Sequence, residues 1–387
     1  MAYLRNNTVN LLNLHYGIFA FAMNSGGVFY RVFLLKAGIS APLVLVTAAV
    51  VLIGRFILRP LVLTVAKRFG LRTVVVFGTL VTALQYPCLA FVHGVDRWLV
   101  ALIVTSAIGD TFYWTSYHAY FASLGDSEHR GHQVSAREAL AAVVGIAAPL
   151  IGGWALTTLG PVIAFNVSAG VQVLAALPLL ATPNVGIAQS APGAFKAARH
   201  SIMMFFADGW ICAGYLFVWQ ISMFLSLGES FAAFGGAVAL AAAVGAVAGL
   251  FLGRHIDAGH GGKAVWIAIS VLVLTIVMRA ASMGPAMAVF ANALGALVYC
   301  LYVPTVMTAV YNQAKRSPCS LRFHMATEGG WDAGCAAGSL VAAAFIALGL
   351  PLSFAILLSL AGAMAMLVLL RRYYAELEAE PSAVVSD

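Results

Sequence analysis

The sequence predicts an all-α integral membrane protein with twelve transmembrane helices in two pseudo-symmetric six-helix bundles. Hydrophobic residues make up 62% of the 387 positions and charged residues only 9%, whereas soluble domains carry about 25% charged residues. Apolar stretches of about 18 residues or more, long enough to cross a bilayer, recur along the whole chain. The segment 136–160 is echoed by 326–349, each with a glutamate near its start and Leu-Gly at its end. Such a repeat indicates two copied halves with a functional site where they meet.

Twelve spans can be assigned from the apolar stretches and the polar turns between them. They cover residues 7–35, 40–66, 71–91, 97–124, 132–158, 161–182, 199–227, 230–254, 263–282, 285–313, 320–348 and 351–371. We predict an N-terminal half at 1–182 and a C-terminal half at 199–372, joined by a central cytoplasmic loop at 183–198. The acidic tail 373–387 is expected to be disordered.

The net charge of +7 does not indicate nucleic-acid binding, because the basic residues fall in short clusters between apolar spans. With both termini in the cytoplasm, most Lys and Arg residues lie on the inner side, as the positive-inside rule requires. Only Lys36, Arg97 and Arg279 then fall outside. The five cysteines lack CxxC spacing, so we expect them to be packing residues and not a metal or disulfide set. The sequence shows no metal-ligand cluster or phosphate-binding glycine loop, so no cofactor is expected.

Two basic, glycine-containing turns occupy the same place in the two halves, at 66–73 and 253–263. With the six-plus-six division, they make the chain resemble the major facilitator superfamily, whose signature turn reads Gly-x-x-x-Asp-Arg/Lys-x-Gly-x-Arg/Lys. The second turn keeps Gly253 and Asp257. The first keeps Arg68, Gly70 and Arg72, but Leu63 and Lys67 stand where glycine and aspartate belong. The cytoplasmic latch that we predict consists of Arg68, Arg72, Glu138 and Asp257.

The fifth span resembles the Gly-Pro-x-x-Gly-Gly motif of the superfamily's antiporters. It reads Gly145-x-x-x-Pro149-x-x-Gly152-Gly153, with Ala148 in place of a glycine. This likeness favours export over uptake.

Charges inside a bilayer are costly, so each needs a partner or a function. Arg55 and Arg59 share one face of the second span, and Glu328 and Asp332 share one face of the eleventh, both at i, i+4 spacing. Arg59 matches Glu328 in depth, and Arg55 matches Asp332. The resemblance implies that these helices face each other between the halves, so we predict a double ion pair that closes the cytoplasmic side. The alternative is pairing within one half, such as Arg55 with Asp110.

Two further carboxylates are candidates for proton coupling. Asp110 precedes an aromatic-polar run in the fourth span and shares a helix face with Trp114 and Tyr117, which suits a water-facing helix. Asp208 lies in the seventh span, and its alternative role is a structural ion pair or hydrogen bond. His118 could relay protons or be a structural histidine. Arg31, near the outer end of the first span, is expected to extend toward the interface, and the alternative is that it binds the substrate.

The resemblance implies that the first, fourth, seventh and tenth spans line a central cavity. These spans carry much of the polar and aromatic content of the membrane segments. The predicted cavity residues are Asn13, Tyr16, Asn24, Tyr113, Trp114, Tyr117, Trp219, Gln220, Tyr299 and Tyr302.

These features predict a secondary active transporter of a small organic solute that works by alternating access. The chain has no Walker motif, so ATP is not the expected direct energy source. The protonatable carboxylates inside the spans favour a proton gradient instead, and the protein is expected to be an exporter or antiporter. The alternatives are a proton symporter for uptake of a sugar, carboxylate or siderophore-like solute, an integral-membrane enzyme, and a non-transporting receptor or assembly factor. We expect a monomer in the bacterial cytoplasmic (inner) membrane that binds lipid, protons and its solute, and no nucleic acid.

Overall fold

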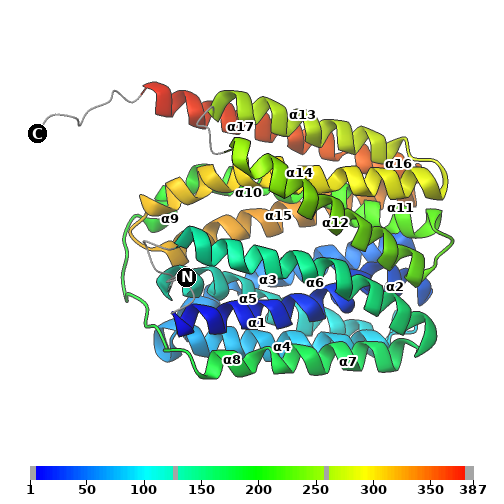
Figure 1. Cartoon of the computed structure of the whole chain (residues 1–387), viewed down its shortest axis with the longest axis horizontal. Helices are drawn as coiled ribbons and strands as arrows, with labels where there is room; N and C mark the ends of the chain where they lie inside the picture. Colours follow the sequence, from blue (N-terminus) through cyan, green and yellow to red (C-terminus); the bar gives the residue numbers. More distant parts are fainter. Residues whose placement is uncertain (1–5, 125–129, 257–260, 380–387) are drawn as a thin grey trace, which may run out of the picture.

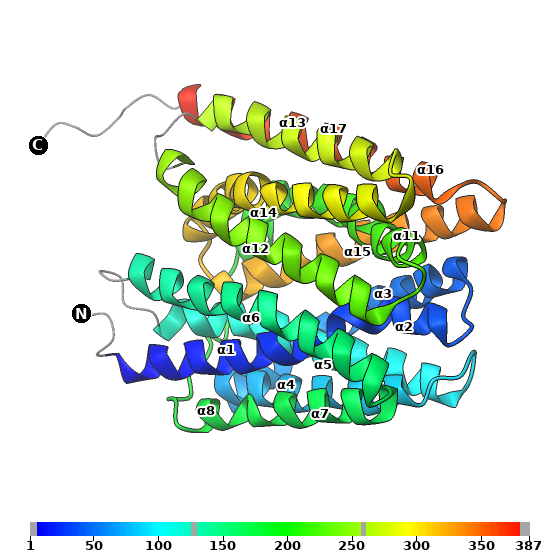
Figure 2. The same ribbon diagram turned by 45° about the vertical axis from the view of Figure 1, so that its right-hand side comes forward.

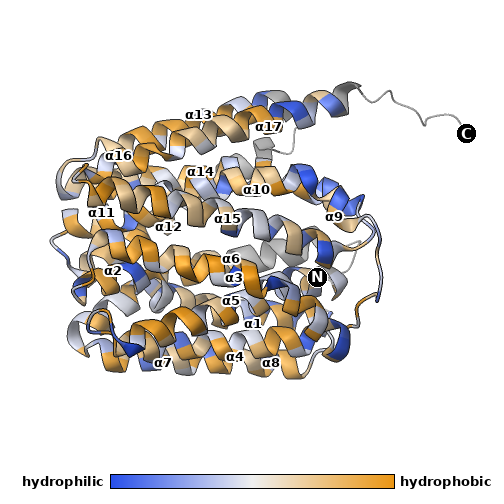
Figure 3. Ribbon diagram, turned by 180° about the vertical axis from the view of Figure 1, so that it is seen from behind, coloured by the Kyte–Doolittle hydropathy of each residue, from blue (hydrophilic) through white to orange (hydrophobic). Residues whose placement is uncertain are grey.

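The computed structural model describes residues 6–124, 130–256 and 261–379. It contains twelve helical segments long and apolar enough to cross a membrane. These confirm the predicted twelve spans, with ends shifted by a few residues. Within the described residues every regular element is a helix. Figure 3 shows hydrophobic residues along the lengths of the helices, with hydrophilic residues gathered toward their ends.

The first six spans form one bundle, the lower one in Figure 1. Its helices are α1 (Asn7–Ser25), η2 (Gly27–Phe29), α2 (Tyr30–Lys36), α3 (Ala41–Phe69), α4 (Leu71–Ala90), α5 (Arg97–Leu124), α6 (Arg130–Thr158), α7 (Pro161–Leu174) and α8 (Ala176–Leu180). The first span therefore consists of α1, η2 and α2, and the sixth of α7 and α8.

The last six spans form the second, upper bundle (Figures 1 and 2). After the short helix α9 (Ala194–Ala197) its helices are α10 (Arg199–Cys212), the π-helical η3 (Ala213–Val218), α11 (Trp219–Ser226), α12 (Phe231–Ile256), α13 (Gly261–Ala280), α14 (Gly284–Lys315), α15 (Ser320–Ala347), α16 (Leu352–Leu357) and α17 (Ser359–Ala379). The seventh span thus has three parts, with the π-helical segment in its middle.

The halves meet mainly along two helix pairs, α3 with α15 and α6 with α12. The start of α1, the end of α17 and the connection carrying α9 all lie at the same end of the molecule (Figures 1 and 2). That arrangement requires an even number of crossings in each half. One prediction needs correction: residues 373–379, expected to begin a disordered tail, continue helix α17 to Ala379. The other tail residues lie outside the described part of the chain.

The turn between α3 and α4 is bound to the connection between the halves. Gly70 ends α3 with φ +79°, a conformation that favours glycine. The Asn184 side chain donates to the Phe69 carbonyl at 2.7 Å and accepts from the Arg72 backbone N–H at 3.1 Å. A Cβ on Gly70 would overlap this side chain. The close approach therefore requires glycine at this position.

Candidate functional site

A buried charge cluster lies at the contact between α3 and α15. Asp332 is completely buried, with its carboxylate between two arginines of the other half. Its Oδ1 lies 3.1 Å from Arg55 Nε, and its Oδ2 accepts a short hydrogen bond from Arg59. Arg55 also lies 3.8 Å from the Glu328 carboxylate and 3.9 Å from that of Asp110 on α5. The cluster thus combines pairing between the halves with a longer contact inside the first half.

The pairing differs from the predicted one at Arg59. The sequence paired Arg59 with Glu328 by depth, whereas Arg59 bonds Asp332 and donates to Thr115 Oγ1 at 2.8 Å. The reason is that Asp332 lies opposite the turn between Arg55 and Arg59, so that one carboxylate serves both. Glu328 remains at the edge of the cluster, where its side chain is 17% exposed.

Asp208 lies in a separate polar site inside the second half. Its carboxylate accepts from the Tyr302 hydroxyl at 2.7 Å and from Trp331 Nε1 at 3.1 Å. These contacts join α10, α14 and α15. Both hydrogen-bond donors to Asp208 are neutral, which agrees with the alternative of a structural hydrogen bond. The role of Asp208 in proton coupling stays a prediction.

The predicted aromatic residues of α5 pack tightly against α1. Tyr113 and Tyr117 are completely buried. The Tyr113 ring stacks on Phe19 with centroids 3.8 Å apart, and Tyr117 stacks on Tyr16 at 5.6 Å. Trp114, on the neighbouring face, is half-buried. In this conformation Tyr113 and Tyr117 face their own half.

His15 on α1, which is not among the predicted site residues, is a buried neighbour of these rings. Its Nδ1 lies 2.7 Å from the Ala175 carbonyl and its Nε2 lies 3.1 Å from the Tyr113 hydroxyl. The buried imidazole thereby joins the first, fourth and sixth spans. A histidine in an apolar span was the available sequence signal. Asn13 on the same helix is half-buried, and the Asn24 side chain donates to its own helix at the Ala20 carbonyl.

The remaining predicted cavity residues lie in the second half. Trp219 is buried and donates from Nε1 to Asn292 Oδ1 at 3.0 Å. Tyr302 is held by Asp208, whereas Tyr299 is 57% exposed. These side chains come from the seventh and tenth spans, and their part in a central cavity stays a prediction.

The side chain of Arg31 does not extend toward the outer interface, so this prediction was wrong. It reaches from α2 into the second half, where it donates to Gln220 Oε1 at 3.1 Å. Its guanidinium carbon lies 3.4 Å from the centre of the Phe217 ring. Nε is buried without a hydrogen-bond partner. Near this contact, Lys36 and Glu229 form an exposed ion pair between the halves at 3.0 Å.

Arg279, counted as an outer-loop charge from the sequence, is in fact 4% exposed inside the last turn of α13. It donates to the Tyr215 carbonyl at 2.5 Å, and its guanidinium carbon lies 3.9 Å from the Tyr215 ring centre. Tyr215 belongs to the π-helical segment. The arginine therefore binds the irregular part of the seventh span instead of extending into water.

Within the described residues, the predicted latch residues Arg68 and Arg72 contact different partners and not each other. Arg72 donates to the Thr182 carbonyl at 2.9 Å, so it holds the end of the sixth span. Arg68 is exposed and lies over the Phe69 ring. Asp257 and the side chain of Glu138 lie outside what the structure describes, so the latch stays a prediction.

Two glycines of the antiporter-like motif, Gly145 and Gly153, lie against the other half, whereas Gly152 lies against Ser25 of its own half. A Cβ on Gly153 would stand 2.6 Å from the Phe231 carbonyl oxygen of α12. In return, a Cβ on Gly235 of α12 would overlap the Pro149 carbonyl oxygen of α6. The two backbones thus touch directly, as small residues allow in membranes.

Comparison with known proteins agrees with this architecture. Residues 13–320 match the family model described as Major Facilitator Superfamily. The crystal structure of a point mutant of the nucleoside transporter NupG superposes with a TM-score of 0.66 at 14% identity, covering 96% of this chain and 99% of that one. The POT family transporter PepTSo gives 0.71 at 10% identity, covering 97% and 99%. No curated protein sequence matches the chain. At these identities the structures establish the shared fold, while the family match covers most of the sequence, and the chain is therefore a membrane transporter that belongs to the major facilitator superfamily.

Proposed function

We propose that this transporter is proton-coupled and moves a small organic solute by alternating access of its two halves. The observation that carries the proposal is the buried cluster of Arg55, Arg59, Asp332 and Glu328, whose members come from opposite halves. A proton on Asp332 would remove the counter-charge shared by the two arginines. Uncompensated buried charges are costly, so protonation would favour separation of α3 and α15.

Asp110 is the second coupling residue in this proposal. Its carboxylate lies 3.9 Å from Arg55, within reach if Arg55 leaves Asp332. An exchange of Arg55 between the two carboxylates would link a local ion pair to the contact between the halves. Export in exchange for protons is the preferred direction because the fifth-span motif resembles that of antiporters. We place the protein, as a monomer, in the bacterial cytoplasmic membrane with both termini inside.

Reconstitution into proteoliposomes with an imposed pH gradient tests the coupling. A screen of small organic solutes should find at least one whose flux follows the gradient, and Asp110→Asn should lower that gradient-driven flux at least about tenfold. The matched control is Glu229→Gln, which removes an exposed ion pair between the halves and should leave flux nearly unchanged. Gradient-driven flux that persists in Asp110→Asn would refute its coupling role.

A second candidate, uptake of a carboxylate by proton symport, is favoured by Arg31. No described carboxylate pairs with its guanidinium, although an anion would satisfy the buried Nε. Arg31→Gln is then expected to weaken binding of benzoate about tenfold, and Arg31→Lys less, because lysine keeps the charge but not the planar fork. Benzamide, which has the same ring without the charge, is the control ligand for a thermal-shift titration. Equal protection by both compounds would exclude this candidate.

A further inference from the structure

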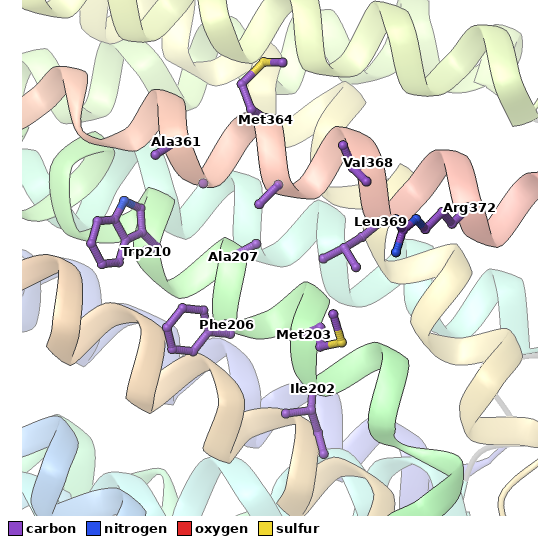
Figure 4. A pocket seen from close by; sticks show the side chains of 12 residues that line it. Ile202, Met203, Phe206, Ala207, Trp210, Ala361, Met364, Val368, Leu369 and Arg372 are labelled. Carbon is purple, nitrogen blue, oxygen red and sulfur yellow. The ribbon is translucent and has the colours of Figure 1, made fainter.

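The structure contains an apolar groove on the outer surface of the second half, between α10 and α17 (Figure 4). Its volume is about 720 Å³. Met203 and Phe206 line one side, and Ala361, Ala365 and Val368 line the other. Met203, Phe206 and Val368 are between 43% and 48% exposed, so the groove opens away from the protein. Both helices belong to membrane spans, which puts this opening against lipid.

The helices that form the groove are packed closely at its floor. The ideal Cβ position on Gly362 lies 2.8 Å from the Ala207 carbonyl oxygen and 3.1 Å from the Trp210 ring. The Trp210 indole donates to the Leu358 carbonyl at 2.9 Å. The groove is therefore a hollow in a closed helix pair and not a passage toward the central site.

Only one end of the groove is charged. Arg372 lies at that end, as Figure 4 shows, and Ala361 lies toward the other. Between them α17 rises by about 16 Å at 1.5 Å per residue. This length is about half of the ~30 Å hydrocarbon core of a bilayer. The groove thus matches one leaflet, with the charge where the lipid headgroups lie.

The Arg372 side chain is exposed. Within the described residues, no carboxylate pairs with its guanidinium. Arg199 begins α10 at the same end of the pair, followed by His200. This end of the molecule carries the central connection and is the one predicted to face the cytoplasm, where anionic lipids attract basic residues.

We propose that this groove binds an anionic phospholipid of the inner leaflet, with an acyl chain between α10 and α17 and the phosphate on Arg372. An acyl chain would pack against the apolar walls, and an anionic headgroup would pair with the guanidinium of Arg372. The site is separate from the charge cluster between the halves. Its occupant would be held against α10, whose Ala207 and Trp210 contact α17 at the groove floor.

Native mass spectrometry of the purified full-length protein in detergent tests the site. Phosphatidylglycerol and phosphatidylcholine with the same acyl chains are added in equal amounts. The wild type should retain phosphatidylglycerol in preference, and Arg372→Gln should reduce that preference about fivefold, the contribution expected of one basic residue near a membrane surface. The matched control is Arg371→Gln, because Arg371 lies instead over the Trp266 ring of α13 and should keep the preference.

A second variant tests the groove itself. Ala365 is exposed on the groove wall, so Ala365→Trp should fill the hollow without disturbing the core and should reduce retention of both lipids. Equal loss of preference in Arg371→Gln and Arg372→Gln would overturn the proposal in favour of a diffuse basic surface. Unchanged lipid retention in Ala365→Trp would also overturn it. A dimer that Ala365→Trp dissociates would overturn it as well, because a second copy and not a lipid would then cover this face.

Discussion

Replacing Asp332 with asparagine is expected to reduce solute flux more than tenfold and to lower the free energy of unfolding by about 3–5 kcal/mol, the usual cost of breaking a buried ion pair. Asp332 is completely buried and holds both Arg55 and Arg59. Asparagine keeps the shape of the side chain but leaves two buried positive charges without their shared counter-charge. Thermal unfolding in detergent and flux in proteoliposomes measure the two effects.

Two further variants test how much Glu328 contributes to this cluster and whether Arg59 and Asp332 act by direct pairing. Glu328→Gln should cost much less stability, because the Glu328 carboxylate lies 3.8 Å from Arg55 and is partly exposed. The double exchange Arg59→Asp with Asp332→Arg should recover part of the flux if direct pairing between the halves matters. Flux within twofold of wild type in Asp332→Asn would contradict the gating role.

Replacing Gly235 with alanine is expected to impair transport severely. The added Cβ would overlap the Pro149 carbonyl oxygen in the other half, so α12 and α6 must move apart. Overpacking of this kind typically costs about 1–3 kcal/mol, and here the shift falls on a surface where the halves meet. Flux and melting temperature should both fall.

The adjacent residue supplies the control. Gly236 is on the same helix, and a Cβ there would meet no atom within 4 Å. Gly236→Ala should therefore leave flux unchanged and raise stability slightly, since alanine is favoured over glycine in helices by about 1 kcal/mol. If both variants behave alike, helix propensity and not the close approach explains the effect.

The sequence predicted the spans well because apolar runs of membrane length have few alternative structures. Together with the family resemblance, which places the second and eleventh spans opposite each other, the cost of unpaired charges in the bilayer predicted the pair of Arg55 with Asp332 but not the partner of Arg59. The detailed pairing could not be predicted. The depth of each charge was counted in residues along its own helix. That count does not include how α3 and α15 pack against each other, which brings Asp332 within reach of both arginines.

The arginines near the outer ends show a second limit. Arg31 was expected at the interface because a long side chain near a helix end can reach water, and Arg279 was counted among the charges on the outer side. Both instead turn inward onto the seventh span, where aromatic rings and polar acceptors replace water. Nothing in the local pattern distinguishes these two directions, since the acceptors lie on other helices.

The π-helical segment Ala213–Val218 also affects how the seventh span is read. A π-turn adds a residue to the α-helical repeat, so residues after it are rotated by about 100° relative to an uninterrupted helix. Asp208, before the segment, contacts its own half through Tyr302, whereas Gln220, after it, contacts Arg31 of the other half. Helical-wheel phases assigned to the inner part of this span therefore do not carry over to its outer part, and a periodicity analysis has to be fitted separately on each side of the insertion.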